Sequence, residues 1–324
     1  MKPAPIASSL AANTGLSGDC DETLELYRGP LGIAELLFCR GMRTKVGQAW
    51  RVPHYQFVIP QAGAFVWHTP DSDIVGDANQ VLVASEGQSA KFSHPSGAEK
   101  SFVFTPSLEL LQSITQVSSN RFRYQPAFVA KVRPAHAALQ RTIARIGAAA
   151  LDGHLVELEE RLTVAARYIL SDTSEPSLVL RSRSAVTVRR AKECLHANFK
   201  SRPSLQDIAS AVGRSALYLT DLFKRSQGTP LYAYQLRLRL AEALRLLPSC
   251  EDITGLALDL GFSSHSHFTH SFRKHFGTPP SEVRSESRAR SDEAACSPKR
   301  LGSVRRERTP LCLARGGNGP VDQA

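Results

Sequence analysis

The pattern of apolar residues divides the chain into a strand-like part and a helical part. Between residues 25 and 128, short segments rich in aromatic and β-branched residues alternate with Gly, Ser and Pro. Four of these segments are predicted strands: residues 54–59, 64–68, 80–84 and 101–105. Residues 60–63, Pro-Gln-Ala-Gly, have the composition of a turn. Several short strands at this spacing predict a β-sandwich or a small barrel.

The apolar period becomes helical after residue 135 and predicts helices over 135–151 and 154–171. An apolar stripe at steps of three and four runs along the second helix: Leu155, Leu158, Leu162, Ala165 and Ile169. A two-heptad stripe of this kind either packs on its own β-domain or pairs with a second subunit. The sequence leaves both possibilities open.

Residues 186–284 are predicted to be helical throughout and contain one unit twice. The corresponding small residues are Ala209, Gly213 and Gly228 in the first copy and Ala257, Gly261 and Gly277 in the second. Ser204 and Asp207 resemble a capping box, and Ser215 and Ser263 are placed to cap the helix that follows each turn. A short helix, a turn at Gly and a second helix with one apolar stripe form the helix-turn-helix plan. A long helix starting at Pro230 joins the copies.

Length and cysteine content favour a two-domain protein with reduced thiols. The chain has 324 residues, 42% of them hydrophobic, which allows two domains with real cores. No run of 18 apolar residues occurs, so we expect no membrane-spanning helix, and the N-terminus is a poor signal peptide. Six scattered cysteines, without C-x-x-C or a His at metal spacing, indicate reduced thiols in a cytoplasmic protein and predict no metal site and no cofactor.

The charge is unevenly distributed. Residues 1–180 hold 16 Lys and Arg against 17 Asp and Glu, whereas residues 181–324 hold 24 against 13. The whole excess of positive charge therefore lies in the helical part. A basic half joined to a neutral half is typical of a polyanion-binding module attached to a second domain.

The repeated unit resembles a known family. Residues 186–284, and most closely the stretch Gly261-Phe-Ser-Ser-His through Arg284, resemble the DNA-binding domain of the AraC/XylS family of bacterial transcription regulators. Residues 25–128 are more weakly similar to the cupin-like β-barrel sensor domains of that family, chiefly over 66–82. The resemblance implies an α+β protein: an N-terminal cupin-like β-barrel with a helical dimerisation or linker segment, and a C-terminal all-α domain with two helix-turn-helix units.

The expected organisation has five parts: a flexible lead-in (1–24), a sensor and dimerisation domain (25–172), a linker (173–185), the DNA-binding domain (186–284) and a disordered basic tail (285–324). The family implies a cytoplasmic, sequence-specific regulator, more often an activator, which binds promoter DNA as a homodimer, contacts RNA polymerase and responds to a small-molecule effector. It is not expected to be an enzyme.

The family also implies two recognition helices in successive major grooves. By motif position, the base-reading residues are Ala216, Leu217, Thr220, Asp221, His265, Ser266, Thr269 and His270. The residues placed for phosphates are Arg189, Arg190, Lys224, Arg225, Arg273 and Lys274. Two positions depart from expectation. Asp221 stands where the family often has a basic or amide residue, and Gly255 costs its helix about 1 kcal/mol relative to Ala.

Other readings stay open. Tyr55, Phe57 and Trp67 either line an effector pocket or fill the core, and the sequence favours the core. A cupin-type metalloenzyme with an appended DNA-binding domain would need the H-x-H plus Glu cluster, which His54, His68 and His94 do not form. An effector-independent architectural DNA-binding protein would not need a separate β-domain.

Overall fold

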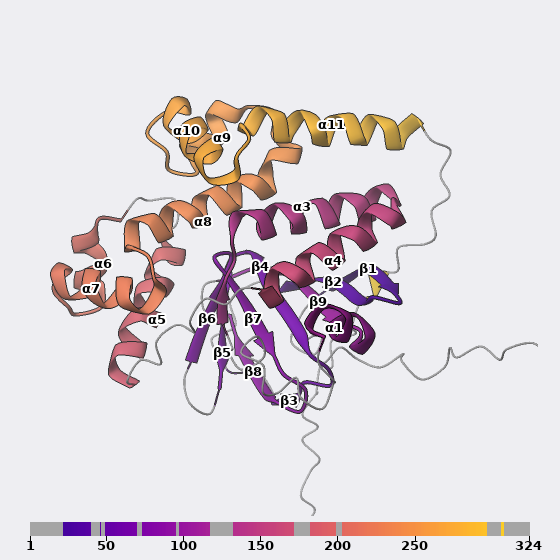
Figure 1. The fold of residues 1–324 in the computed structure, drawn as a ribbon. Coiled ribbons are helices and arrows are strands. Elements are labelled where there is room, and N and C mark those ends of the chain that lie inside the picture. Colours follow the sequence, from indigo (N-terminus) through magenta and orange to yellow (C-terminus); the bar gives the residue numbers. More distant parts are fainter. Residues whose placement is uncertain are drawn as a thin grey trace, which may run out of the picture.

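A computed structural model of the chain describes residues 22–39, 46, 49–69, 73–94, 97–116, 132–171, 182–198, 203–296 and 306–307. It contains an N-terminal β-sheet domain and a C-terminal helical domain (Figure 1). None of the helices in these ranges has both the length and the apolar character needed to cross a membrane.

Two antiparallel sheets form the N-terminal domain. The strands are β1 (Glu22–Gly29), β2 (Gly32–Cys39), β3 (Trp50–Arg51), β4 (Gln56–Ala62), β5 (Ala64–His68), β6 (Asp73–Asp77), β7 (Gln80–Ala84), β8 (Ser89–Ser93), β9 (Glu99–Pro106), β10 (Val132–Pro134) and β11 (Arg306–Glu307). One sheet has the order β10-β7-β4-β9-β2-β1-β11, and the other has the order β3-β8-β5-β6.

The two sheets do not close into the predicted cupin-like barrel within the described residues. An apolar layer that includes Leu37 and Val103 from one sheet and Trp67 and Phe92 from the other fills the space between them. The rings of Trp67 and Phe92 are stacked with centroids 6.2 Å apart. Large side chains facing one another from both sheets produce a packed sandwich.

The turn between β4 and β5 is tighter than predicted. Pro60 and Gln61 belong to β4, and the chain reverses at Gly63, whose φ is +70°. A Cβ at Gly63 would collide with the carbonyl of Ala98, so only glycine fits.

Helices α1 (Leu108–Thr115), α3 (Ala137–Asp152) and α4 (Leu155–Ser171) belong to the same domain. Leu158, Leu162, Ala165 and Ile169 of the predicted stripe are buried in one core with Phe57 and Phe104 of the seven-stranded sheet. This stripe therefore packs on its own domain and is not available to a second subunit. Leu155 alone stays exposed, at 57%.

The C-terminal domain contains α5 (Ser182–Ala197), α6 (Leu205–Ala211), α7 (Ala216–Gln227), α8 (Leu231–Leu246), a short 3-10 turn (Leu247–Ser249), α9 (Ile253–Asp259), α10 (His265–Phe276) and α11 (Pro280–Cys296). The first helix pair, α6 and α7, and the second helix pair, α9 and α10, lie at opposite ends of α8 (Figure 1). Leu238 of α8 belongs to the core of the first pair and Leu244 to that of the second.

Both ends of this domain differ from the predicted boundaries. Helix α5 begins at Ser182, inside the expected linker. Helix α11 continues to Cys296, inside the expected disordered tail. Within α11, Arg284 and Arg288 donate to the carbonyls of Glu251 and Cys250. Apart from β11, the rest of the predicted tail lies outside the described residues.

Candidate nucleic-acid interface

The first helix pair is built from local signals in the sequence. The predicted capping box is present: the Ser204 hydroxyl accepts from the Asp207 amide, and the Asp207 carboxylate accepts from the Ser204 amide. Gly213, with φ +66°, ends α6, and the Ser215 hydroxyl accepts from the Tyr218 amide to begin α7. The apolar stripe of α7 is buried, namely Leu219, Leu222 and Phe223. The opposite face of α7, with Leu217 and Tyr218, is exposed.

The second helix pair repeats the arrangement. The Asp252 carboxylate accepts from the amides of Thr254 and Gly255. A Cβ at Gly255 would lie 2.7 Å from that carboxylate, so glycine at this position makes room for the N-cap. Gly261, with φ +81°, forms the turn. Ser264, and not the predicted Ser263, caps α10 by accepting from the His267 amide.

The predicted base-reading residues lie on the exposed faces of α7 and α10. On α7, the Leu217 side chain is 82% exposed, Asp221 is exposed, and Ala216 and Thr220 are half-buried. On α10, His265, Ser266 and His270 are exposed and Thr269 is half-buried. A hydrogen-bonded row fixes part of this face, because His265 Nε2 lies 3.3 Å from Thr269 Oγ1 and His265 Nδ1 lies 3.4 Å from Thr254 Oγ1.

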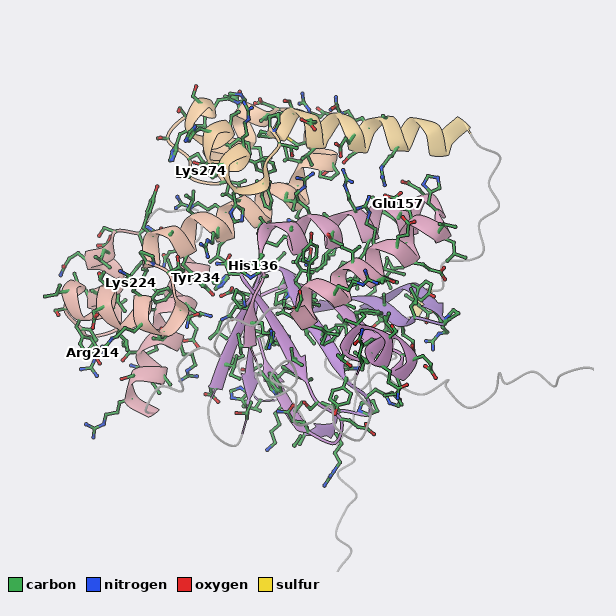
Figure 2. All side chains as sticks on the ribbon, in the orientation of Figure 1. His136, Glu157, Arg214, Lys224, Tyr234 and Lys274 are labelled. Atoms are coloured by element: carbon green, nitrogen blue, oxygen red, sulfur yellow. The ribbon has the colours of Figure 1, made fainter. Side chains whose placement is uncertain are left out.

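Exposed cations lie on both helix pairs and on α5. Lys224 of α7 and Lys274 of α10 are labelled in Figure 2, and Arg225, Arg273 and Arg190 are also exposed. The negative charge of Asp221, unexpected at this position, has a partner on the same helix. Its carboxylate lies 2.8 Å from the guanidinium of Arg225, one turn later. A pair of this kind on an exposed helix face orients both side chains and contributes little stability.

Two basic residues of this domain differ from their neighbours. Arg189, which the sequence places at a phosphate, is directed to the β-domain, with its guanidinium 3.2 Å from the Asp73 carboxylate. Burial, together with the charge of Arg237, lowers the pKa of His275 to about 4. His275 is therefore neutral at pH 7, and the positive charge late in α10 comes from Arg273 and Lys274.

The helical domain matches a known protein family. The profile described as a helix-turn-helix domain matches residues 208–286. The probable transcription factor PqrA of Proteus vulgaris is 38% identical over 81 residues, which is 25% of this chain and 66% of PqrA. The transcriptional activator AarP of Providencia stuartii is 30% identical over 106 residues, which is 32% of this chain and 78% of AarP. The chain belongs to the AraC/XylS family of transcription regulators.

The family match lies within the helical domain, at residues 208–286. A crystal structure of a transcriptional regulator with an AraC-type DNA-binding domain from Chromobacterium violaceum is 37% identical and covers 32% of this chain and 94% of that one, with a TM-score of 0.31. The chain spans about a third of the length of the Msm operon regulatory protein of Streptococcus mutans and of PocR of Salmonella typhimurium, at 36% and 33%.

A buried ionic cluster joins the two domains of this AraC-family regulator. Asp77, at the end of β6, has no exposed surface, and its carboxylate lies 3.6 Å from Lys192 Nζ and 3.5 Å from His196 Nε2 of α5. The Tyr234 hydroxyl of α8 donates to the same carboxylate at 2.5 Å. The Asn79 amide donates to the Tyr234 carbonyl at 3.1 Å. Helices α5 and α8, which share a core with the first helix pair, are thereby fixed to the edge of the smaller sheet, a contact that sequence reasoning missed.

The electrostatics of Asp77 favour its charged form. Burial by itself raises the pKa of Asp77, but the attraction of Lys192 and the hydrogen bonds from His196 and Tyr234 outweigh burial. The pKa of Asp77 is consequently held well below its ordinary value. Three partners from two helices are needed to keep one carboxylate ionised in the interior.

A second contact joins the domains through α3. The Arg141 guanidinium donates to the Phe276 carbonyl at 2.6 Å, next to the left-handed Gly277 that ends α10. Arg145 forms an ion pair with Glu286 at 3.1 Å, and Arg290 reaches Glu157 at 2.8 Å. The β-domain thus contacts the helical domain in two places, at α5 and α8 and at α10 and α11.

Between these contacts lies a cavity of 420 Å³. Its apolar lining comes from both domains, with Leu36, Phe102 and Ile143 from the β-domain and Leu244 and Val283 from the helical domain. Lys100 of β9 also lines it, with Nζ 5.3 Å from the centroid of the Phe38 ring. None of Tyr55, Phe57 and Trp67 lines this cavity, because all three side chains are buried in the cores of the β-domain.

Proposed function

We propose that this regulator binds promoter DNA sequence-specifically through both helix pairs, each acting as a helix-turn-helix unit with α7 and α10 as recognition helices. The observation that carries the proposal is the same geometry at both ends of α8, an apolar stripe inward and polar residues with cations outward. With 16 residues at 1.5 Å each, α8 is about 24 Å long, of the same order as one turn of B-DNA.

Two sets of residues on these helices would have different roles in recognition. We assign base contacts to Ala216, Leu217, Thr220, Asp221, His265, Ser266, Thr269 and His270, since His, Ser and Thr hydrogen-bond base edges and Leu217 can touch a thymine methyl. We assign phosphate contacts to Arg190, Lys224, Arg225, Arg273 and Lys274. We place the β-domain at residues 22–171, from the start of β1, which lies inside the predicted lead-in, to the end of α4, and extend the DNA-binding domain to 182–296, the span of its helices.

His270→Ala and Arg273→Ala test this assignment in the full-length protein. If His270 reads a base, His270→Ala should reduce the preference for the cognate site by about 1–3 kcal/mol and leave binding to random DNA almost unchanged. Arg273→Ala should weaken binding to both DNAs and make the slope of log affinity against log salt less steep by about one, because one fewer counterion is released. The measurement is a salt titration on both DNAs.

Arg28→Ala is the matched control, because Arg28 is an exposed arginine of the β-domain that pairs with Glu25. It should change neither the affinity nor the salt slope. If His270→Ala weakens binding to both DNAs equally, or Arg273→Ala leaves the salt slope unchanged, the roles assigned to the two residues are wrong.

We infer that a small-molecule effector binds in the 420 Å³ cavity between the domains, and not inside the β-sandwich as the sequence suggests. The volume is that of an ordinary ligand pocket. Burial lowers the pKa of the Lys100 ammonium, so an anionic group beside it would stabilise the charged form. The chemistry of the walls fits an organic anion with an apolar body. Such a ligand would touch the β-domain, α8 and α11 together.

The fluorescent apolar anion 8-anilinonaphthalene-1-sulfonate is a probe for this cavity. Lys100→Gln should weaken its binding about tenfold or more, since a hydrogen bond to a charged group contributes about 1.5–3 kcal/mol. Lys91→Gln, which removes an exposed lysine from β8, should leave the dissociation constant unchanged. Equal loss in both variants, or in neither, would place the anion elsewhere.

We further propose a cytoplasmic homodimer that activates transcription by contacting RNA polymerase. AarP, a relative, is named an activator. For dimerisation, the outer face of α4 offers Val156, Val164 and Tyr168 at helical spacing, with 73%, 37% and 44% of each side chain exposed. The alternative of an effector-independent architectural DNA-binding protein gains no support from a molecule that has a cavity between its domains.

A further inference from the structure

Three buried side chains with metal-binding atoms meet at one end of the β-sandwich. Cys39 is the last residue of β2, Glu99 is the first residue of β9, and the two are direct partners in the register of these strands. His94 follows β8, a strand of the other sheet. The three residues are exposed by only 2%, 4% and 5%, in the order Cys39, His94 and Glu99.

The three donor atoms are close enough to share one ion. One ligand atom from each residue lies within 4.8 Å of the other two, and His94 Nε2 is 3.7 Å from Glu99 Oε2. Bond lengths of about 2.0–2.3 Å to tetrahedral zinc place neighbouring ligand atoms about 3–4 Å apart. Small rotations of these side chains would bring all three atoms onto such a sphere.

An aromatic ring and a hydroxyl group lie beside the cluster. The ring of Phe65 packs against His94 with centroids 6.3 Å apart, and the Ser101 hydroxyl donates to the Glu99 carboxylate. Among the described residues, no Lys or Arg forms an ion pair with Glu99. A charge in an apolar interior is stable only with a partner. A divalent ion bound by one thiolate, one carboxylate and one neutral imidazole has a net charge of zero.

We propose that Cys39, His94 and Glu99 form a binding site for a divalent metal ion of the Zn²⁺ type, which joins the two sheets of the sandwich. The mixture of sulfur, nitrogen and oxygen ligands suits Zn²⁺ and disfavours Mg²⁺ and Ca²⁺, which prefer oxygen ligands alone. Because the ligands come from both sheets, the ion stabilises the packing of the β-domain. This site lies in the sandwich, apart from the cavity and from the helix pairs, and does not depend on the proposed function.

The site has no signature in the sequence. His94 and Glu99 are five residues apart, and Cys39 precedes them by more than fifty residues. The sequence therefore predicts no metal, and only the pairing of β2 with β9 brings Cys39 to the other two.

Cobalt substitution tests the proposal on the full-length protein. Metal-free protein titrated with Co²⁺ should take up one equivalent. It should gain a thiolate-to-cobalt charge-transfer band in the near ultraviolet and visible bands of tetrahedral Co²⁺, and Zn²⁺ should remove both. Cys39→Ser should abolish the charge-transfer band. His94→Gln and Glu99→Gln should weaken Co²⁺ binding at least tenfold. Cys194→Ser and Cys250→Ser, which replace cysteines of the helical domain, should titrate like the wild type.

Thermal unfolding gives a second readout. Since a ligand that binds only the folded state stabilises it, Zn²⁺ should raise the Tm of the wild type and chelator should lower it. Glu99→Gln, which nearly preserves the shape of the side chain, should remove the response to Zn²⁺ while its circular dichroism remains that of a folded protein. A wild type without a charge-transfer band, or a Cys39→Ser or Glu99→Gln variant that binds metal as the wild type does, would overturn the site.

Discussion

Replacing Asp77 by asparagine is expected to lower the free energy of unfolding by about 3–5 kcal/mol, because it leaves the charge of Lys192 buried without its partner. Asparagine has nearly the same size as aspartate, so the loss in free energy of unfolding would come from the missing charge and not from a change in volume. Chemical denaturation of the full-length protein measures it. Asp73→Asn, at the exposed start of the same strand, is the control and should cost about 0–1 kcal/mol.

The contribution of the ionised Asp77 carboxylate should also appear in the pH dependence of the free energy of unfolding. Since the pKa of Asp77 is lower in the folded protein than in the unfolded chain, its contribution is complete above the unfolded value of 3.8 and is lost as the pH falls below it. The wild type should therefore lose stability below about pH 4 more steeply than Asp77→Asn. Parallel acid profiles of the two proteins would show that the carboxylate is not ionised in the fold.

Leu162→Ala is expected to destabilise the β-domain by about 2–5 kcal/mol, because Leu162 has no exposed surface and lies in the core beneath α4. Val164→Ala, two residues later and 37% exposed, should cost well under half as much. Both variants are compared by chemical denaturation. Similar costs at the two positions would mean that α4 does not pack on the sheet as described.

Substitutions on the buried and the exposed face of α4 should distinguish folding of the domain from dimerisation. Leu158→Asp with Leu162→Asp should unfold the domain, since both side chains are buried in their own chain. Val156→Asp with Tyr168→Asp should leave it folded and convert dimers to monomers in sedimentation experiments. A folded wild type that stays monomeric at tens of micromolar would exclude the proposed dimer.

The parts of the fold that the sequence predicted are those specified by neighbouring residues. Ser204 and Asp207 signal a helix start three residues apart, and Gly213 and Gly261 signal turns by themselves. Short runs of aromatic and β-branched residues identified β4, β5, β7 and β9. Each signal acts within one turn or one strand, so it can be read without knowing the tertiary structure.

The parts that the sequence did not predict depend on distant residues. The residues around Asp77 do not indicate an ion pair with Lys192, and those around Arg189 do not indicate one with Asp73. Each pair forms only when the two domains are in contact. The Leu158 and Leu162 stripe fits both an intramolecular and an intermolecular partner, and only the position of the sheet decides between them. Whether strands close into a barrel likewise depends on pairings that no single segment encodes.

Because α8 contributes to two cores, its length is a constraint on how the protein can evolve. At 3.6 residues per turn, one inserted residue would rotate the second helix pair by about 100° against the first and shift it by about 1.5 Å. The Arg141 contact to Phe276 and the Tyr234 contact to Asp77 would then no longer form in the same molecule. Seven inserted residues, close to two full turns, would restore the orientation but move the pairs apart. Insertions and deletions should therefore be tolerated in the loops of this protein and selected against within α8.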